Sequence, residues 1–207
     1  DKDLAAELAD HGFQFSSANS INIGRLVPQI VYYVYAYAKL FENGEIEKDE
    51  TINVTVPTGN FGNILAAYFA KRMGLPIKTL ICASNDNKLL YDFFTTGTYD
   101  RKREFILTNS PSMDILISSN LERLIYLSAG CDASVSAALM RELSENGSYT
   151  VTDEMRRFME DFVGGYAGQK QNADTIRRIF KDTGYLVDTH TGVAAAVYYD
   201  YANRTGD

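Results

Sequence analysis

The 207-residue sequence predicts an α/β fold, with a parallel sheet, flanking helices and a helical insertion around residues 110–165. The first observation is an apolar, β-branched run at 51–56, followed by a helical pattern at 64–73 and a second apolar run at 77–83. Such short connections indicate a βαβ unit, whose strands are parallel and whose crossover is right-handed. The second observation is the strongly helical pattern that follows Ser110-Pro111-Ser112.

The residues before this unit are expected to form two helices separated by a short strand. Residues 4–9 form the first helix, and the alternation in Phe13-Gln14-Phe15 indicates a brief strand. The second helix covers about 24–42, because apolar residues recur there at steps of three and four. These residues are Leu26, Ile30, Tyr33, Val34, Tyr37 and Phe41. Asn43-Gly44 ends this helix.

The residues after the unit are predicted to be mostly helical. The expected helices run over 88–96, 120–130, 132–147, 152–163, 173–182 and 193–203. Asn120 and Asn172 stand where they would cap two of these helices. The basic stretch 98–104 is expected to be a surface loop, and the glycine-rich stretch 164–168 a flexible join. Few strands are visible for a freestanding doubly wound domain, which suggests a piece of something larger.

Composition and charge narrow the classes of function. Hydrophobic residues make up 45% and charged residues 23% of the chain, as in ordinary soluble globular proteins. The net charge of −7 argues against a nucleic-acid-binding protein, so that a local site must hold any anionic ligand. Two cysteines, no apolar run of membrane length and no secretion signal are typical of a cytoplasmic protein. Both ends look cut, because the chain starts at Asp1 without an initiator Met and stops at Asp207 within polar sequence.

A glycine turn between the first strand and helix of the unit is a candidate anion site. Gly59 and Gly62 lack the Cβ atom that would hold a ligand away from the backbone. The first-turn N–H groups of the next helix point into the same space, and the whole forms a cradle that most often binds phosphate. The turn is no nucleotide P-loop, because Gly-Lys-Ser/Thr does not follow it. An ordinary turn that needs glycine only for its backbone angles is the alternative interpretation.

A second candidate anion site precedes the helix at 24–42. Asn19, Ser20 and Asn22 offer short hydrogen-bonding side chains, and Arg25 lies in the first helical turn. Amide, hydroxyl, helix dipole and guanidinium together suit a phosphate or a carboxylate. From the residues alone, simple capping by serine or asparagine beside a solvated Arg25 is the preferred interpretation.

His190 is one of only two histidines and stands at the start of the last predicted helix. A functional imidazole is one interpretation, but a capped helix with a hydrogen-bonded histidine is the more common case. The histidines and cysteines are dispersed without metal-ligand spacing, and no Gly-x-Ser-x-Gly nucleophile elbow occurs.

Four motifs occur in order along nearly the whole chain. They are Ser17-Ala18-Asn19-Ser20-Ile21-Asn22-Ile23-Gly24-Arg25-Leu26, Val56-Pro57-Thr58-Gly59-Asn60-Phe61-Gly62-Asn63, Ser110-Pro111-Ser112-Met113-Asp114-Ile115-Leu116 and Asp188-Thr189-His190-Thr191-Gly192-Val193-Ala194. Their combination resembles bacterial threonine synthase, a pyridoxal phosphate (PLP) enzyme with the fold of tryptophan synthase β, that is, of fold type II PLP enzymes. That family converts O-phosphohomoserine and water to threonine and inorganic phosphate, as a lyase of threonine biosynthesis.

The resemblance implies roles for the two candidate anion sites. The residues that match the loop around the 5′-phosphate of the cofactor are Gly59, Asn60, Phe61, Gly62 and Asn63. Ser20 and Arg25, with Asn19 nearby, match residues that hold the phosphate of the substrate, which reverses the preference for simple capping. The resemblance assigns no role to His190.

The resemblance also implies that part of the active site lies outside this sequence. The lysine that forms the Schiff base with the cofactor comes before the start of this chain in the family, and the contacts to the pyridine nitrogen come after its end. The lysines without a matching context are Lys39, Lys71, Lys78 and Lys88. Residues 1–23 then resemble the tail of the small domain, and 24–207 a partial large PLP-binding domain. The sequence is therefore expected to be a fragment of threonine synthase that is inactive alone.

Two rival classes stay open. One is another PLP enzyme of the same fold, such as a dehydratase or a sulfhydrylase, whose substrates need no phosphate site. Ser20 and Arg25 argue against this class. The other is a non-catalytic module that binds phosphate through the turn at 59–63. The sequence does not indicate the oligomeric state.

Overall fold

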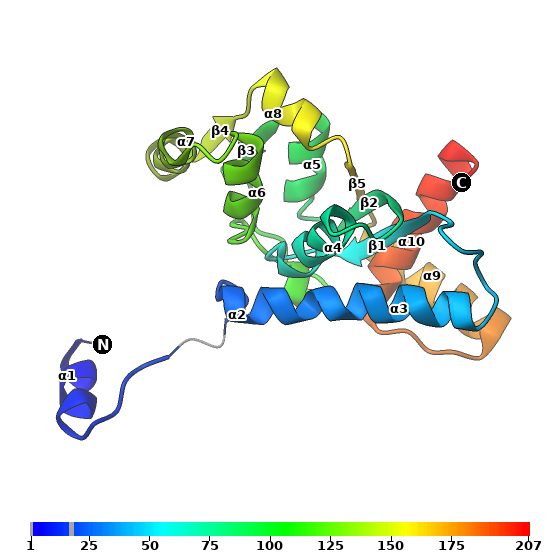
Figure 1. Ribbon diagram of the computed structural model, residues 1–207, viewed down its shortest axis with the longest axis horizontal. Coiled ribbons are helices and arrows are strands. Elements are labelled where there is room, and N and C mark those ends of the chain that lie inside the picture. Colours follow the sequence, from blue (N-terminus) through cyan, green and yellow to red (C-terminus); the bar gives the residue numbers. More distant parts are fainter. Residues whose placement is uncertain (1, 17–18) are drawn as a thin grey trace.

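A three-stranded parallel sheet forms the centre of the computed structural model, which describes residues 2–16 and 19–207 (Figure 1). The strands lie in the order β1 (Ile52–Pro57), β2 (Ile77–Ser84) and β5 (Phe162–Tyr166). Helix α4 (Gly62–Arg72) connects β1 to β2, as the strand–helix–strand pattern predicted. The predicted α/β fold with a parallel sheet and flanking helices is therefore confirmed.

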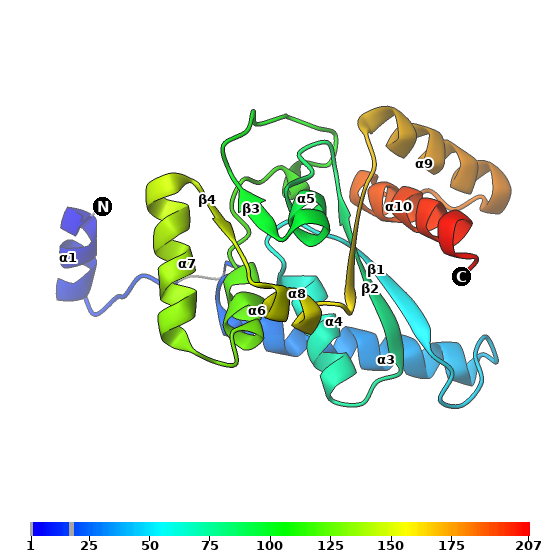
Figure 2. The same ribbon diagram turned by 90° about the horizontal axis from the view of Figure 1, so that it is seen from above.

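The central strand β2 separates two layers of the hydrophobic core. Leu80 and Cys82 belong to the cluster on the side of α4, whereas Ile81 and Ala83 belong to the cluster on the opposite side. This alternation follows the two-residue period of a strand, and helices cover both faces of the sheet (Figure 2). The other flanking helices are α5 (Leu89–Thr96) and α6 (Leu121–Ser128) on the α4 side, and α9 (Gln169–Thr183) and α10 (Thr189–Thr205) on the other.

Helices dominate the predicted insertion around 110–165, but it also contains strands. Besides α6, its helices are the 3₁₀ turn η2 (Pro111–Met113), α7 (Ala133–Asn146) and α8 (Asp153–Phe158). Strand β4 (Ser148–Thr150) pairs antiparallel with β3 (Thr98–Asp100), so the predicted surface loop at 98–104 is wrong in its first residues. The rings of Tyr99 and Tyr149 stack 5.3 Å apart across this pair. Strands this short show no alternation in the sequence.

The glycine-rich stretch at 164–168 is not a flexible join, because most of it belongs to β5. A Cβ atom on Gly165 would lie 2.4 Å from Cγ1 of Val197, and one on Gly164 would lie 3.1 Å from the Cα of Tyr91. Helices α5 and α10 therefore pack directly on the backbone of this strand. The glycines mark a close approach between elements, and the sequence alone does not distinguish that from a linker.

Of two predicted helix caps, Asn172 is wrong, and Asn120 is right in position but not in its side-chain bonding. Helix α9 begins at Gln169, so Asn172 lies inside it, fully buried. The start of α9 is instead capped by the distant Asp86. A carboxylate oxygen of Asp86 accepts a hydrogen bond from the Gln169 N–H, 3.1 Å away. Asn120 does precede α6, but its side chain makes no capping bond. Helix α8 ends at Phe158, earlier than predicted.

The N-terminal helices differ from their predictions in detail. Helix α1 (Lys2–Asp10) stands apart from the rest of the chain in both views, and residues 13–15 form no strand (Figures 1 and 2). The single helix predicted over 24–42 consists of three pieces: α2 (Ile23–Leu26), the 3₁₀ turn η1 (Val27–Gln29) and α3 (Ile30–Glu42). Pro28 lies in the 3₁₀ turn, where its missing N–H costs little.

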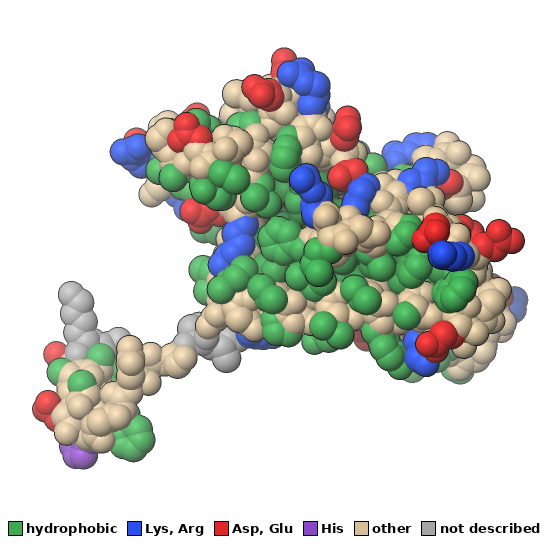
Figure 3. Space-filling view, viewed as in Figure 1, with side chains coloured by type: hydrophobic (Ala, Val, Ile, Leu, Met, Phe, Trp, Pro, Cys, Tyr) green, Lys and Arg blue, Asp and Glu red, His purple; other side chains and the backbone are tan. Residues whose placement is uncertain are grey.

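Helix α3 presents many apolar side chains to solvent. Of the residues that suggested the buried face of the predicted helix, Leu26 is buried but lies in α2, whereas Val34 and Phe41 of α3 are 46% and 49% exposed. Figure 3 shows hydrophobic side chains gathered along this helix. The spacing of apolar residues therefore predicted helical structure in this region, but not its division into three pieces, and predicted its burial only in part.

Candidate functional site

The glycine turn follows the carboxyl end of β1 and leads into α4. Phe61 stands at the N-cap position with φ of 64°, and no side chain of the described residues caps this end of the helix. Leu65 is the first residue whose N–H bonds back, to Phe61 O at 3.1 Å. The N–H groups of Gly62, Asn63 and Ile64 therefore remain available at the helix N-terminus, where the helix dipole favours an anion.

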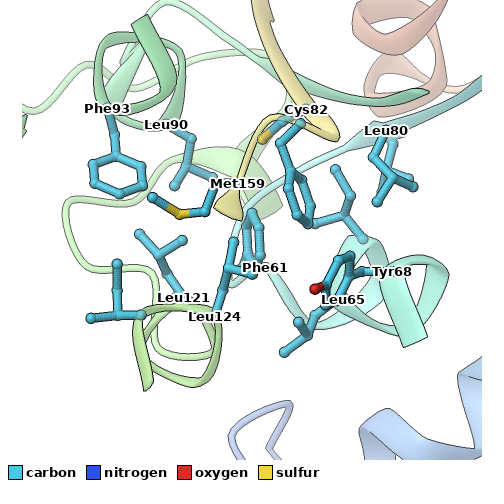
Figure 4. Close-up of a cluster of buried hydrophobic side chains, with 14 of the residues drawn as sticks. Phe61, Leu65, Tyr68, Leu80, Cys82, Leu90, Phe93, Leu121, Leu124 and Met159 are labelled. Carbon is cyan, nitrogen blue, oxygen red and sulfur yellow. The ribbon is translucent and has the colours of Figure 1, made fainter. Parts of the chain in front are cut away.

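Phe61 is the residue of the turn that adopts the left-handed conformation, which costs a non-glycine residue about 1–3 kcal/mol. Its side chain is 1% exposed and lies within the hydrophobic core (Figure 4). The ring packs against Phe94 and Phe162, with ring centroids 6.0 and 5.6 Å away. Burying a phenylalanine contributes about 1.5–3 kcal/mol, enough to offset the strained backbone. The aromatic core therefore holds the turn in its conformation.

The two glycines of the turn allow neighbouring segments to approach. A Cβ atom on Gly59 would lie 2.3 Å from Ser112 O, and one on Gly62 would lie 3.3 Å from Asn120 Nδ2. Neither glycine has a positive φ, which disfavours the interpretation that they serve only unusual backbone angles. Their Cβ positions face the protein, so the glycines shape the turn by admitting Ser112 and Asn120.

One cleft of about 230 Å³ brings the two predicted anion sites together. Its lining residues are Ser20, Arg25, Gln29, Val56, Pro57, Thr58, Gly59, Asn60, Phe61, Gly62, Asn63, Ile64 and Ser112. All five residues predicted around the cofactor phosphate lie here, with two of the three predicted around the substrate phosphate. The segments meet although some 35 residues of chain separate Arg25 from Asn60.

The segment before α2 uses different side chains for capping and for the cleft. Asn22 caps the helix, because its Oδ1 accepts a hydrogen bond from the Gly24 N–H at 2.8 Å. The Oδ1 of Asn19 accepts from Ser20 Oγ at 3.2 Å and from the Ile21 N–H at 3.3 Å. Asn19 therefore lies outside the cleft lining and shapes the loop that carries Ser20. The capping interpretation explains Asn22 and leaves Ser20 and Arg25 in the cleft.

Two residues that the sequence did not single out for this site support Asn63. Its Oδ1 accepts a hydrogen bond from the Tyr33 hydroxyl, and its Nδ2 donates to Gln29 Oε1 at 2.9 Å. Burial raises the pKa of the Tyr33 phenol, so it stays protonated and can donate. Gln29 also lines the cleft. No sequence motif indicated these contacts, because they join residues 30 and 34 positions apart in the chain.

His190 lies behind the cleft. Its Nδ1 is 3.0 Å from Asp188 Oδ1, and its Nε2 accepts a hydrogen bond from the Ser112 N–H at 3.2 Å. Asp188 also caps α10, and hydrogen bonds, first from the Thr191 hydroxyl, lower the pKa of its carboxyl to about 2. The arrangement agrees with a capped helix that carries a hydrogen-bonded histidine. It also supports Ser112, which lines the cleft and abuts Gly59.

No lysine of the described residues lines the cleft. The four lysines considered above have other partners: Lys39 pairs with Glu42, Lys71 with Asp161, Lys78 with Asp207, and Lys88 lies over the ring of Tyr166. The side chain of Lys71 is mostly buried, with 21% of it exposed.

The described residues offer no second site with the chemistry of this cleft. Larger hollows of about 580 and 400 Å³ lie beside α6 and α8, without the glycine turn. Within residues 2–16 and 19–207, no group of histidine, cysteine, aspartate and glutamate side chains could hold a metal ion. None of the helices described there combines the length and apolar character needed to cross a membrane.

No protein-family model matches the chain, but both sequence and structure comparisons find threonine synthases and threonine synthase-like proteins. The threonine synthase-like 1 protein of Homo sapiens is 44% identical over 190 residues, which cover 91% of this chain and 26% of that protein. The threonine synthase of Schizosaccharomyces pombe is 36% identical over 212 residues, covering 92% of this chain and 41% of that enzyme. The crystal structure of PLP-bound threonine synthase from Brucella melitensis superposes with a TM-score of 0.83 at 40% identity, covering 93% of this chain and 39% of that one. The chain thus spans about a quarter to two-fifths of the length of these relatives.

Proposed function

Over the part that it spans, the chain belongs to the threonine synthase family, and we propose that it forms the phosphate-binding part of a PLP-dependent active site. The proposed reaction of the whole protein converts O-phosphohomoserine and water to threonine and phosphate. The observation that carries the proposal is the shared cleft, in which Ser20 and Arg25 face the turn at 59–63. Because two phosphates take part in this reaction, one on the cofactor and one on the substrate, it needs two anion sites close together.

The turn at 59–63 fits the 5′-phosphate of PLP. The first-turn N–H groups of α4 offer backbone donors without a competing side-chain cap, and the helix dipole favours the negative charge. The buried Phe61 side chain anchors the turn in the aromatic core beside the start of α4. When bound, PLP supplies the electron sink for proton abstraction from the amino-acid substrate. This chain would hold and orient the phosphate end, and the lysine that the family requires would come from elsewhere in the protein.

Ser20 and Arg25 fit the phosphate of the substrate. A guanidinium binds phosphate through two parallel hydrogen bonds, and the serine hydroxyl adds a third donor. In the reaction the bond between Cγ and the phosphate oxygen breaks, and the hydroxyl of water is added at Cβ. Negative charge accumulates on the departing phosphate, so a donor that is already in place stabilises the transition state more than the ground state.

The proposal is tested by comparing two substrates with the full-length, PLP-loaded protein. We expect release of inorganic phosphate from O-phosphohomoserine and little turnover of L-serine. Efficient deamination of L-serine without phosphate release would instead favour a dehydratase of the same fold. Binding of inorganic phosphate without any binding of PLP would favour a non-catalytic module.

We further propose that residues 1–23 belong to the small domain and 24–207 to the large PLP-binding domain. The separate position of α1 supports assigning that helix to another domain (Figure 1), whereas Ser20 and Ile21 contact Asn120 and Arg123 of the large part. We propose a cytoplasmic location, which the two free cysteines Cys82 and Cys131 support. Fractionation of cells that express the full-length protein would test the location.

A further inference from the structure

One buried side-chain amide, that of Asn120, joins the two segments that form the cleft. Its Nδ2 donates hydrogen bonds to Ser20 O at 3.0 Å and to Asn60 O at 2.9 Å. The backbone N–H of Asn120 also donates to Asn60 O, at 3.1 Å. We propose that Asn120 is a positioning residue that couples the two phosphate sites, so that binding at the turn at 59–63 orders the loop at 19–25. The inference rests on the proposed function and adds a regulation of affinity to it.

Arg123 fixes the orientation of this amide. One guanidinium nitrogen donates to Asn120 Oδ1 at 3.0 Å, and the other donates to Ile21 O at 2.9 Å. Because a guanidinium has only donors, it must face the amide oxygen, which leaves the NH₂ group for the two backbone carbonyls. The rotated amide would place its oxygen against both carbonyl oxygens. The hydrogen-bonding pattern therefore admits one orientation of the Asn120 amide. Arg123 adds a second hydrogen bond to the loop, through Ile21 O.

The packing around Asn120 keeps this bridge short. Asn120 is 0% exposed and precedes α6, whose Leu121 and Leu124 are buried in the core (Figure 4). Gly62 lies beside it, since a Cβ atom there would be 3.3 Å from Asn120 Nδ2 and 3.9 Å from Ser20 Cβ. Only glycine lets the turn, the loop and the amide meet without displacement. A side chain expected to cap its helix serves this bridge instead, which is why its N-cap position carries no capping bond.

The hydrogen bonds of Asn120 connect the loop at 19–25 to the turn at 59–63. Asn120 is fully buried at the start of α6, whereas both of its carbonyl partners belong to segments that contact an anion in the proposed site. A ligand that orders Asn60 restricts the amide, and the amide in turn restricts Ser20. The first ligand to bind meets the entropy cost of ordering both the turn at 59–63 and the loop at 19–25. The second ligand then binds more tightly, because that cost does not arise again. By linkage, the substrate phosphate must favour cofactor binding by the same factor, typically 5–150-fold for coupled sites.

Hydrogen exchange of the full-length protein, with and without PLP, tests this coupling. In the wild-type protein, PLP is expected to slow amide exchange several-fold at 59–65 and also at 19–25. The isosteric variant Asn120→Asp places carboxylate oxygens against both carbonyls, so protection should persist at 59–65 and disappear at 19–25. The matched control Glu122→Gln makes the reverse exchange of carboxylate and amide at an exposed position of the same helix, and should behave like the wild type. Equal protection of 19–25 in Asn120→Asp and wild type would overturn the proposal, because it would indicate direct contact with PLP.

A second comparison does not depend on PLP binding. In the PLP-free protein, exchange at 19–25 is expected to be faster in Arg123→Met than in the wild type, because the hydrogen bonds of Arg123 to Ile21 O and to Asn120 Oδ1 are lost. Unchanged exchange in this variant would contradict the bridge, also if Asn120→Asp fails to fold. Absence of PLP protection at 59–65 in the wild type would instead contradict the proposed function, which separates the two failures.

Discussion

Replacing Arg25 with alanine in the full-length protein is expected to lower kcat/KM for O-phosphohomoserine far more than it weakens PLP binding. Arg25 lines the cleft beside Ser20, whereas the 5′-phosphate is expected at the N–H groups of α4. A hydrogen bond between charged groups contributes about 1.5–3 kcal/mol, and each 1.4 kcal/mol corresponds to a factor of ten. The expected loss in kcat/KM is therefore about 10–150-fold, with PLP affinity unchanged within about twofold.

The exposure of Arg25 places the expected loss toward the lower end of this range at high salt, because solvent and ions screen the guanidinium. Arg25→Lys keeps the charge and loses the two-pronged geometry, so its loss should be intermediate. A suitable control is Arg177→Ala, which removes the same charge from an exposed position on α9 and should leave both quantities unchanged.

The assays are continuous measurement of phosphate release over a range of substrate concentrations and absorbance titration of the apo-protein with PLP. Equal losses in PLP affinity and in kcat/KM for Arg25→Ala would refute the assignment of Arg25 to the substrate. So would a loss of the same size in Arg177→Ala.

Three further predictions concern the turn and its support. Gly59→Ala should lower the Tm and weaken PLP binding, because the new Cβ would lie 2.3 Å from Ser112 O and such overpacking costs about 1–3 kcal/mol. An unchanged Tm would contradict this, because it would show that the turn can move to accommodate the methyl group. Phe61→Ala should cost about 3–5 kcal/mol in denaturant unfolding, reduced by whatever strain is relieved, and a loss below about 1 kcal/mol would contradict the role of the aromatic core. Because folding lowers the pKa of Asp188 from 3.8 to about 2, its carboxylate contributes stability above about pH 4 that is lost as the pH falls toward 2. The difference in unfolding free energy between wild type and Asp188→Asn should therefore be constant above pH 4 and shrink below it, and a difference that grows in acid would contradict this linkage.

The sequence predicted the parallel sheet and the glycine turn because both depend on local patterns. The β-branched run, the turn and the helix are consecutive in the chain, so periodicity alone located β1, α4 and β2. The strand β5 was missed because Gly164 and Gly165 carry no side chains to show alternation. Their role is to admit α5 and α10, which are distant in sequence.

The two predicted anion sites could be found from local composition, but their joining could not. The backbone of Ser20 is joined to the turn through Asn120, whose carbonyl partners lie 100 and 60 residues away. A residue that precedes a helix is normally assigned as a cap, and the competing bridge is visible only in three dimensions. Asn172 was misassigned for a similar reason, since the distant Asp86 supports the start of α9.

The account predicts two phosphate sites in one cleft, and a crystal structure of the full-length protein with PLP and inorganic phosphate would test this most directly. The 5′-phosphate should lie on the N–H groups of residues 62–64. The inorganic phosphate should lie within hydrogen-bonding distance of Arg25 and Ser20 in the same cleft. Phosphate groups bound away from both segments, for example in the hollow beside α6, would contradict the account.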